Sequence, residues 1–391
     1  MSSNVSRRSR LAAALGLAAL VALSATVAPA SAYKGQGEAV IVAAKHAKGR
    51  TLSGQGVKLL AGAGASAQDR KLSLPIAELN PFSQPSASHP SAQTGAALTF
   101  QRGKRSLALT EIRFNVAAGT LVGKLGASQI EVFRVVGAAS NVNTANGTIA
   151  LNEGQLRLTA AAADQLETGL GLKRALNHKG VGMLWLAAQA SPTHGPAQKV
   201  TGGALDWGFL TSWREYIYRN LGPGSVGSIT TEGGATTVGE PSKPGSYFSF
   251  PATGGSYQQG LFGATDKLSL NAGGSVKFAK PGHCIVEIRF SDIVATLGSA
   301  SSIVADLDYD IDQFNGMGCN PVPPVSAPDT EIATLGSVNP SVSGSTITWA
   351  GLPATLTAAA SAPFAPTYKA GHPLDPATIS VQVEPIAVPA G

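Results

Sequence analysis

The segment Cys284-Ile285-Val286-Glu287-Ile288-Arg289-Phe290 decides the fold class of this chain. Its even-numbered residues are all apolar, whereas two of its three odd-numbered residues are charged. This two-residue period is typical of a half-buried β-strand. Further alternating runs at 246–251 and 267–278 are separated by turns rich in Ser, Gly and Thr. We therefore expect a mostly β protein with antiparallel sheets packed as a sandwich or an open barrel.

An internal repeat predicts two related domains. The run 107–114 ends in Glu-Ile-Arg-Phe, as does the run 284–290, and each run follows a Phe, a basic residue and a Gly. Further along, Thr-Ile and Leu-Thr-Ala-Ala-Ala at 148–149 and 158–162 recur in the same order at 346–347 and 356–360. Two ordered matches indicate duplication. The residues before the two runs are Phe100, Arg102 and Gly103, and Phe278, Lys280 and Gly282.

The N-terminus has the pattern of an export signal. Three arginines precede an apolar run from Leu11 to Val27, and Ala30-Ser31-Ala32 follows. This pattern predicts a signal peptide cleaved after Ala32, with a membrane anchor as the alternative. Ser6-Arg7-Arg8 only partly fits a twin-arginine signal, so both export routes stay open. We therefore expect a secreted or cell-surface protein.

The predicted organisation has five parts. They are a signal peptide (1–32), a first β domain (33–190), a Pro- and Gly-containing linker (191–203), a second β domain (204–385) and a tail (386–391). Each β domain is expected to be sandwich-like, with one or two short helices. The Leu-Thr-Ala-Ala-Ala segments are expected to begin helices.

Charge is divided unevenly along the chain. Residues 33–200 contain 18 Lys and Arg against 8 Asp and Glu, and residues 201–391 contain 8 against 15. Because no basic cluster is interleaved with aromatics, the pattern does not favour nucleic acid. Attraction between the two halves, or to an anionic cell-wall polymer, fits the charge better.

The cysteines are Cys284 and Cys319. In an oxidising compartment an isolated pair is most simply a disulfide, and the spacing is too wide for a compact metal or redox motif.

The residues that follow the linker predict one helix over 205–220. Asp206 would cap its N-terminus, and Gly222 followed by Pro223 would stop it. Tyr216 lies at the edge of the apolar stripe, beside Trp213. Periodicity alone favours a helix whose aromatics seal the sheet. The stripe consists of Leu210, Trp213, Ile217 and Leu221.

This region resembles the HtaA domain of actinobacterial haem-acquisition proteins. The resemblance begins with Asp-Trp-Gly at 206–208 and Ser-Trp-Arg at 212–214, although the family usually has Phe where Trp213 stands. It continues through Tyr-Phe-Ser-Phe-Pro at 247–251 and Gly-His-Pro-Leu-Asp-Pro at 371–376. The resemblance covers nearly all of 204–385, and residues 40–190 are similar to a degenerate copy.

The resemblance implies that the protein binds ferric haem. By position, Tyr216 would be the axial ligand and His283 its hydrogen-bond partner, although an insertion containing Pro281 precedes His283. A phenolate is a hard anionic ligand suited to Fe(III), and a second-shell hydrogen bond tunes it. Trp213, Phe209 and Tyr257 would contact the porphyrin. The alternative for His283 is a solvated turn residue.

The first copy lacks this ligand set. It has no Tyr between Tyr33 and Tyr216, and Lys104 or Arg105 stands in the place of His283. We expect a structural or partner-binding role for it. Its histidines are too far apart for a metal site; they are His46, His89, His178 and His194.

Four aspartates at 306, 308, 310 and 312 alternate along one run, which favours a solvated strand face over a calcium loop.

No hydrolase, phosphate-loop or dinucleotide motif is present, so we expect no enzyme. The leading hypothesis is a secreted protein that captures ferric haem for uptake, with haem-donor or haem-uptake proteins as partners. The alternative is a cell-envelope adhesion or scaffolding protein that binds no haem.

Overall fold

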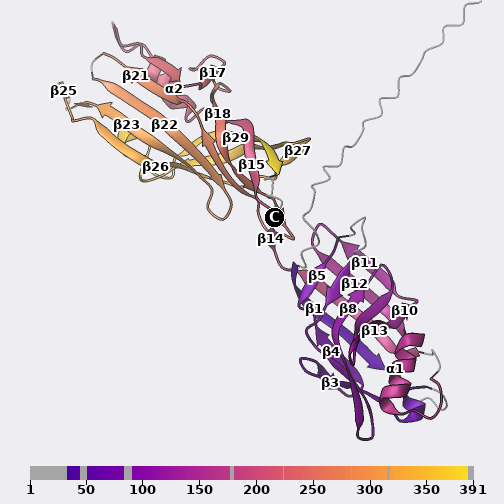
Figure 1. Ribbon diagram of the computed structural model, residues 1–391. Coiled ribbons are helices and arrows are strands. Elements are labelled where there is room, and N and C mark those ends of the chain that lie inside the picture. The colour runs from indigo at the N-terminus through magenta and orange to yellow at the C-terminus, as the bar shows by residue number, and fades with distance from the viewer. Residues whose placement is uncertain are drawn as a thin grey trace, which may run out of the picture.

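The computed structural model describes residues 33–44, 51–82, 90–176, 180–222, 224–282, 284–314 and 318–385. The predicted signal peptide and tail lie outside these ranges, as do Pro223, His283 and three of the four histidines considered above. The chain forms two lobes, which we call the first lobe (33–190) and the second lobe (198–385) (Figure 1).

The first lobe is an antiparallel sheet whose pairings close into a ring. The eight ring strands are β1 (Tyr33–Ala43), β13 (Gly180–Ala190), β12 (Thr148–Leu158), β10 (Ser128–Val136), β9 (Thr120–Leu125), β8 (Arg105–Asn115), β6 (Ser91–Gln93) and β5 (Glu78–Asn80). The others are β2 (Lys58–Ala61), β3 (Ser66–Gln68), β4 (Lys71–Pro75), β7 (Leu98–Arg102) and β11 (Ala139–Asn143).

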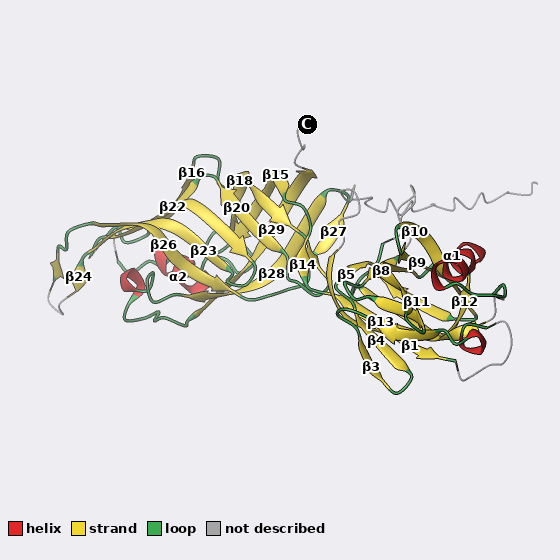
Figure 2. Ribbon diagram, turned by 60° about the horizontal axis from the view of Figure 1, so that its bottom comes forward, coloured by secondary structure: helices red, strands yellow, loops and turns green. Residues whose placement is uncertain are grey.

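The second lobe closes in the same way. Its ring strands are β15 (Gln198–Trp207), β29 (Pro373–Pro385), β28 (Thr346–Leu356), β26 (Val325–Leu335), β23 (Ser302–Ile311), β22 (Val286–Leu297), β20 (Lys267–Ala272) and β18 (Tyr247–Gln258). Attached to them are β16 (Ser228–Glu232), β17 (Thr236–Val238), β21 (Ser275–Lys280), β27 (Ser341–Ser343) and the hairpin of β24 (Gln313–Phe314) and β25 (Cys319–Asn320). The predicted antiparallel β class is confirmed (Figure 2).

The two lobes share one strand order, which supports duplication. β2, β7 and β8 pair side by side as β16, β21 and β22 do. β12 and β28 have the same length. Each has one residue with a left-handed backbone conformation at the equivalent position, Glu153 in β12 and Gly351 in β28.

The first of the two predicted matches, between runs 107–114 and 284–290, was aligned in the wrong register. The hairpin β7–β8 places Phe100 opposite Leu107, and the hairpin β21–β22 places Phe278 opposite Ile288. Leu109 therefore corresponds to Phe290, and Phe114 does not. The shared Glu-Ile-Arg-Phe letters lie at different positions on equivalent strands, because both strands need the same apolar alternation.

Short helices accompany both barrels. Helix α1 (Ala160–Leu170) begins as predicted after Thr159, whose hydroxyl accepts a hydrogen bond from the Ala162 N–H at 3.2 Å. The helix predicted at the second Leu-Thr-Ala-Ala-Ala is wrong: a turn and a short 3-10 helix, η2 (Ala362–Phe364), stand there. Pro363 and Pro366 remove the N–H groups that a longer helix needs.

Each lobe has its own apolar core, and an aromatic contact joins them. Phe262, on a loop of the second lobe, is 4% exposed and belongs to the core of the first lobe. Its ring centroid lies 5.0 Å from that of Tyr33 and 5.9 Å from that of Phe82. The short strands β14 (Thr193–His194) and β19 (Gly260–Leu261) pair beside it.

Candidate functional site

The longest helix of the second lobe, α2 (Thr211–Tyr218), lies at the end away from the first lobe (Figure 1). The helix predicted over 205–220 was too long at both ends. Leu205 and Trp207 belong to strand β15, and both are buried, as the two-residue period of a strand requires. Leu221 is 59% exposed, so it is not part of the buried stripe.

A distant aspartate caps α2 in place of Asp206. The Asp375 carboxylate accepts hydrogen bonds from the Thr211 N–H at 3.1 Å and the Thr211 hydroxyl at 2.8 Å. Asp375 follows the start of β29, beside Trp207, whose indole N–H donates to the Asp375 carbonyl at 3.0 Å. A carboxylate at a helix N-terminus satisfies free N–H groups and favours the helix dipole.

Arg214 fixes the helix to the lobe. Its side chain is fully buried, and its Nη1 lies 3.1 Å from the Asp375 carboxylate. The guanidinium also donates to the carbonyls of Gly208 at 2.6 Å and Pro241 at 2.8 Å. A Cβ at Gly208 would lie 2.2 Å from Arg214 Nη1, so only Gly fits there. Trp207 and Gly208 of one motif and Arg214 of the other thus join Asp375 in one buried polar network.

A buried lysine closes the other end of α2. The Lys280 ammonium donates to the carbonyls of Ile217 at 3.0 Å, Arg219 at 2.7 Å and Ser225 at 2.9 Å. Lys280 is 4% exposed, and burial, with a contribution from Arg219, lowers its pKa. Two of these charge-assisted hydrogen bonds go to carbonyls at the end of α2 and the third to the loop that follows, so they hold the helix C-terminus in place.

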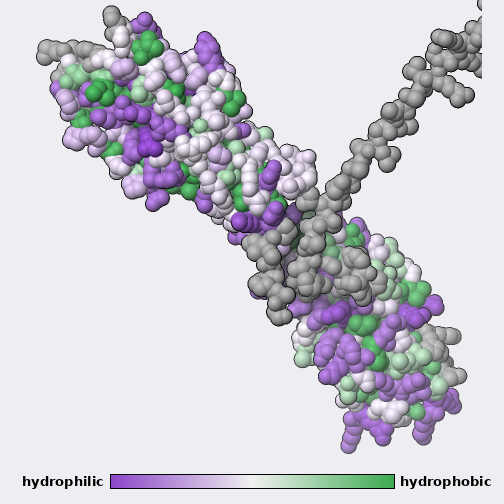
Figure 3. Space-filling model, turned by 45° about the horizontal axis from the view of Figure 1, so that its top comes forward, coloured by the Kyte–Doolittle hydropathy of each residue, from purple (hydrophilic) through white to green (hydrophobic). Residues whose placement is uncertain are grey.

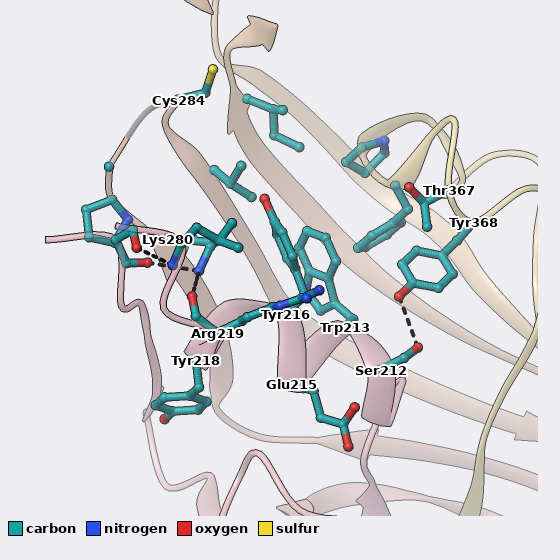
Figure 4. Close-up of a pocket in the computed structure, with 18 of the residues that line it drawn as sticks. Ser212, Trp213, Glu215, Tyr216, Tyr218, Arg219, Lys280, Cys284, Thr367 and Tyr368 are labelled. Atoms are coloured by element: carbon teal, nitrogen blue, oxygen red, sulfur yellow. Dashed lines mark hydrogen bonds between the residues drawn. The ribbon is translucent and has the colours of Figure 1, made fainter. Parts of the chain in front are cut away.

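With both ends held, α2 presents Tyr216 and Trp213 to a large open cavity of about 1690 Å³ (Figure 4). Their rings pack together with centroids 5.3 Å apart. Phe364 and Tyr368 line the cavity from the opposite segment, and the Tyr368 hydroxyl donates to Ser212 Oγ at 3.0 Å. The cavity therefore has an aromatic wall formed by these four side chains, and charged residues such as Glu215 and Arg219 also line it.

The Tyr216 phenol has an unusual environment. Burial raises its pKa, so the free protein holds a neutral phenol there. Lys280 Nζ lies 5.0 Å from the centre of the Tyr216 ring. Within the described residues, no group hydrogen-bonds to the Tyr216 hydroxyl, and the Trp213 indole N–H is buried without a partner. Two polar groups of the residues that form this wall thus have no partner in the part of the chain that the structure describes.

The other predicted site residues lie in different places. Phe209 is 1% exposed, and its ring centroid lies 4.9 Å from that of Phe364. It therefore supports the cavity wall from beneath. Tyr257 does not line the cavity; it packs on Trp349 in the barrel. His283 lies outside the described residues, but its chain neighbours Gly282 and Cys284 both line the cavity.

The predicted disulfide is confirmed. Cys284 and Cys319 are bonded, with their Cα atoms 5.4 Å apart. The bond attaches the segment before β22 to the hairpin of β24 and β25, at the cavity rim.

The aspartates of β23 serve as structural acceptors. Asp306 accepts from the Asp329 N–H and Asp308 from the Ser326 hydroxyl. In the part of the chain that the structure describes, no group of three or more potential ligands is placed to hold a metal ion, and no helix is long and apolar enough to cross a membrane.

Sequence reasoning named Tyr216 and Trp213 but gave no role to Asp375, Arg214 or Lys280. Asp375 and Arg214 stood inside the recognised motifs, and Lys280 was matched to Arg102 in the repeat. In the first lobe Arg102 donates to the Gln55 carbonyl at 3.1 Å, at the end of the 3-10 helix η1 (Ser53–Gln55). A basic residue that closes a helical turn was therefore visible as a repeated position.

Comparison with known proteins finds the HtaA family, described as Htaa, over residues 202–380. Three structures from Corynebacterium glutamicum are similar. The N-terminal domain of HtaA is 25% identical and matches over 47% of this chain and 98% of its own, with a TM-score of 0.36. The C-terminal domain of HtaA is 20% identical, with coverages of 48% and 99% and a TM-score of 0.37. The haem-binding protein HtaB is 17% identical, with coverages of 50% and 98% and a TM-score of 0.36. No curated protein matches the chain.

Proposed function

We propose that this chain, whose residues 202–380 match the HtaA domain family, binds ferric haem in the cavity beside α2, with the Tyr216 phenolate as axial ligand. The observation that carries the proposal is the Tyr216 hydroxyl, which borders an aromatic cavity and has no hydrogen-bond partner among the described residues. A phenolate is one of the protein ligands known for haem iron.

The cavity suits a flat, largely apolar ligand with a metal at its centre. Trp213, Phe364 and Tyr368 supply aromatic surface, which ligand sites use for packing. The neighbouring Lys280 cation favours negative charge on the Tyr216 ring. The Trp213 indole N–H is buried in the same wall and has no partner among the described residues.

His283 remains in the proposal as the hydrogen-bond partner of Tyr216. The support is its position in the chain, between two residues that line the cavity. A hydrogen bond to the bound oxygen would fix its orientation and basicity.

The first lobe does not contribute this ligation. The 3-10 helix η1 stands before β2, where α2 stands before β16 in the second lobe. Its only tyrosine, Tyr33, packs against Phe82 and Phe262 at the contact between the lobes. We propose that the exported protein captures one haem per chain and passes it to an uptake system.

The test is a titration of the mature chain with haemin, followed by visible absorption. We expect saturable binding, and a loss in Tyr216→Phe larger than the roughly 10- to 100-fold cost of removing an outer-shell partner. Tyr218→Phe is the matched control, because the Tyr218 hydroxyl already accepts from the Ile229 N–H at 3.3 Å.

Equal affinity in Tyr216→Phe would remove the ligand assignment. No binding by the unchanged protein would favour the envelope scaffold instead.

A further inference from the structure

One end of the first lobe carries a cluster of basic side chains, which we call the basic end. Five of the six are exposed and Arg102 is half-buried. Figure 3 shows hydrophilic side chains at this tip of the molecule. The basic end consists of Lys58, Arg102, Lys104, Arg105, Lys173 and Arg174.

Three separate segments bring these residues together. Arg102 and Arg105 face each other across the β7–β8 turn, and Lys58 pairs beside them with Gln101. The Arg102 guanidinium donates to the Gly171 carbonyl at 2.8 Å, which places the end of α1 against the turn. The Arg105 guanidinium also lies against Gly171, since a Cβ added there would be 1.9 Å from Arg105 Nη1.

The third segment follows α1. The Gln55 amide donates to the Arg174 carbonyl at 2.8 Å, so 173–174 lies next to η1 and β2. The convergence is thus a product of the fold, since the three segments are far apart in sequence.

The positive charge of the basic end is not neutralised locally. None of its six residues forms an ion pair within the described residues. The neighbouring Glu167 carboxylate, which accepts from the Leu176 N–H at 2.6 Å, is one negative charge against six positive ones. Clustered charges of one sign give a strong local potential that attracts anions.

The basic end and the tyrosine cavity lie at opposite ends of the molecule. Helix α1 marks the end of the first lobe away from the second, and α2 and β25 lie at the far end of the second (Figures 1 and 2). A surface bound by the basic end would leave the cavity facing outward.

We propose that the basic end docks on a membrane surface that contains anionic phospholipids. Arg and Lys bind phosphate groups, and each contributes to attraction near a charged bilayer. The residues lie at strand ends and in the adjoining turns at one tip of the lobe, an arrangement that lets them meet a plane together. Leu60 is 37% exposed on the same face of β2 as Lys58, which gives the tip an apolar contact as well. The proposal does not depend on haem binding.

The test compares sedimentation of the mature chain with vesicles of phosphatidylglycerol and phosphatidylcholine against vesicles of phosphatidylcholine alone. The variant is Lys104→Glu/Arg105→Glu/Lys173→Glu. The control, Lys34→Glu/Arg113→Glu/Arg134→Glu, makes the same change in net charge at the other end of the first lobe, on β1, β8 and β10. Lys104→Gln/Arg105→Gln/Lys173→Gln repeats the test without new acids, and melting temperatures check folding.

We expect binding only to the anionic vesicles, weakened about 100-fold in the Gln variant and further in the Glu variant, since each basic residue near the surface contributes about five-fold and added acids are repelled. The control should retain nearly all of the binding. Equal losses in variant and control would overturn the proposal, because net charge alone would then explain binding. Tighter binding to soluble polyphosphate than to vesicles would overturn it in favour of a phosphate polymer.

Discussion

Replacing Asp375 by Asn tests how α2 is held. The substitution keeps the shape and an oxygen that can accept from the Thr211 N–H, but it removes the charge that faces the fully buried Arg214. Breaking a buried ion pair by removing one partner costs about 3 to 5 kcal/mol, because it leaves an uncompensated charge. Asp375 is 23% exposed, so water screens the pair in part and we expect about 3 kcal/mol.

Urea unfolding followed by tryptophan fluorescence measures this loss. Trp207, Trp213 and Trp349 belong to the second lobe, and Trp185 reports on the first. The second-lobe transition should move to lower urea while the first-lobe transition stays. Asp375→Ala also removes the cap and should cost about 1 kcal/mol more.

The matched control is Asp329→Asn, which makes the same charge change on an exposed residue of the same lobe. Asn tolerates the left-handed backbone found there, so we expect a change within about 0.5 kcal/mol. A loss below about 1 kcal/mol in Asp375→Asn would refute the account of Arg214 as a residue that needs this counter-ion.

Three further predictions concern pH, the disulfide and the contact between the lobes. Burial, together with Asp266, raises the pKa of Tyr257, so the unfolded chain ionises first and the second lobe should lose stability as the pH rises past about 10. Chemical unfolding between neutral and high pH should show this loss, and it should shrink in Tyr257→Phe. Replacing Cys284 and Cys319 by Ser opens a loop of 35 residues and should cost about 3 to 4 kcal/mol in the second-lobe transition. Phe262→Ala removes an aromatic side chain from the first-lobe core and should cost about 3 kcal/mol in urea unfolding, while X-ray scattering should show a wider spread of lobe arrangements.

Each of these three predictions has an outcome that would contradict it. An unchanged pH dependence in Tyr257→Phe would show that another group controls alkaline stability. Equal stability of the oxidised and Ser variants would show that the hairpin of β24 and β25 needs no covalent attachment. Scattering unaltered in Phe262→Ala would assign the contact between lobes to β14 and β19.

The fold was predictable where local pattern and burial agree. The alternation in β22 predicted the β class, and the repeated segments before α1 and η2 predicted the duplication. Both patterns can be read from short stretches of consecutive residues. The start of α2 was not predictable from periodicity. Trp207 lies three residues before Leu210, as a helical stripe requires, and two residues after Leu205, as a strand face requires. The cap that decides where the helix begins comes from Asp375, far along the chain.

The site was predictable in part for the same reason. Tyr216 and Trp213 lie on one short helix, so their spacing places them together. Lys280 approaches from β21, and its three carbonyl partners exist only after the barrel has closed. Tyr257 alternates correctly for its strand, but alternation does not specify which end of the barrel a residue occupies.

The most direct test of the central claim identifies the iron ligand itself. Resonance Raman spectra of the mature chain with ferric haem should show ring modes of an iron-bound phenolate, present in Tyr218→Phe and absent in Tyr216→Phe. The same phenolate modes in Tyr216→Phe would contradict the account, since another tyrosine would then hold the iron.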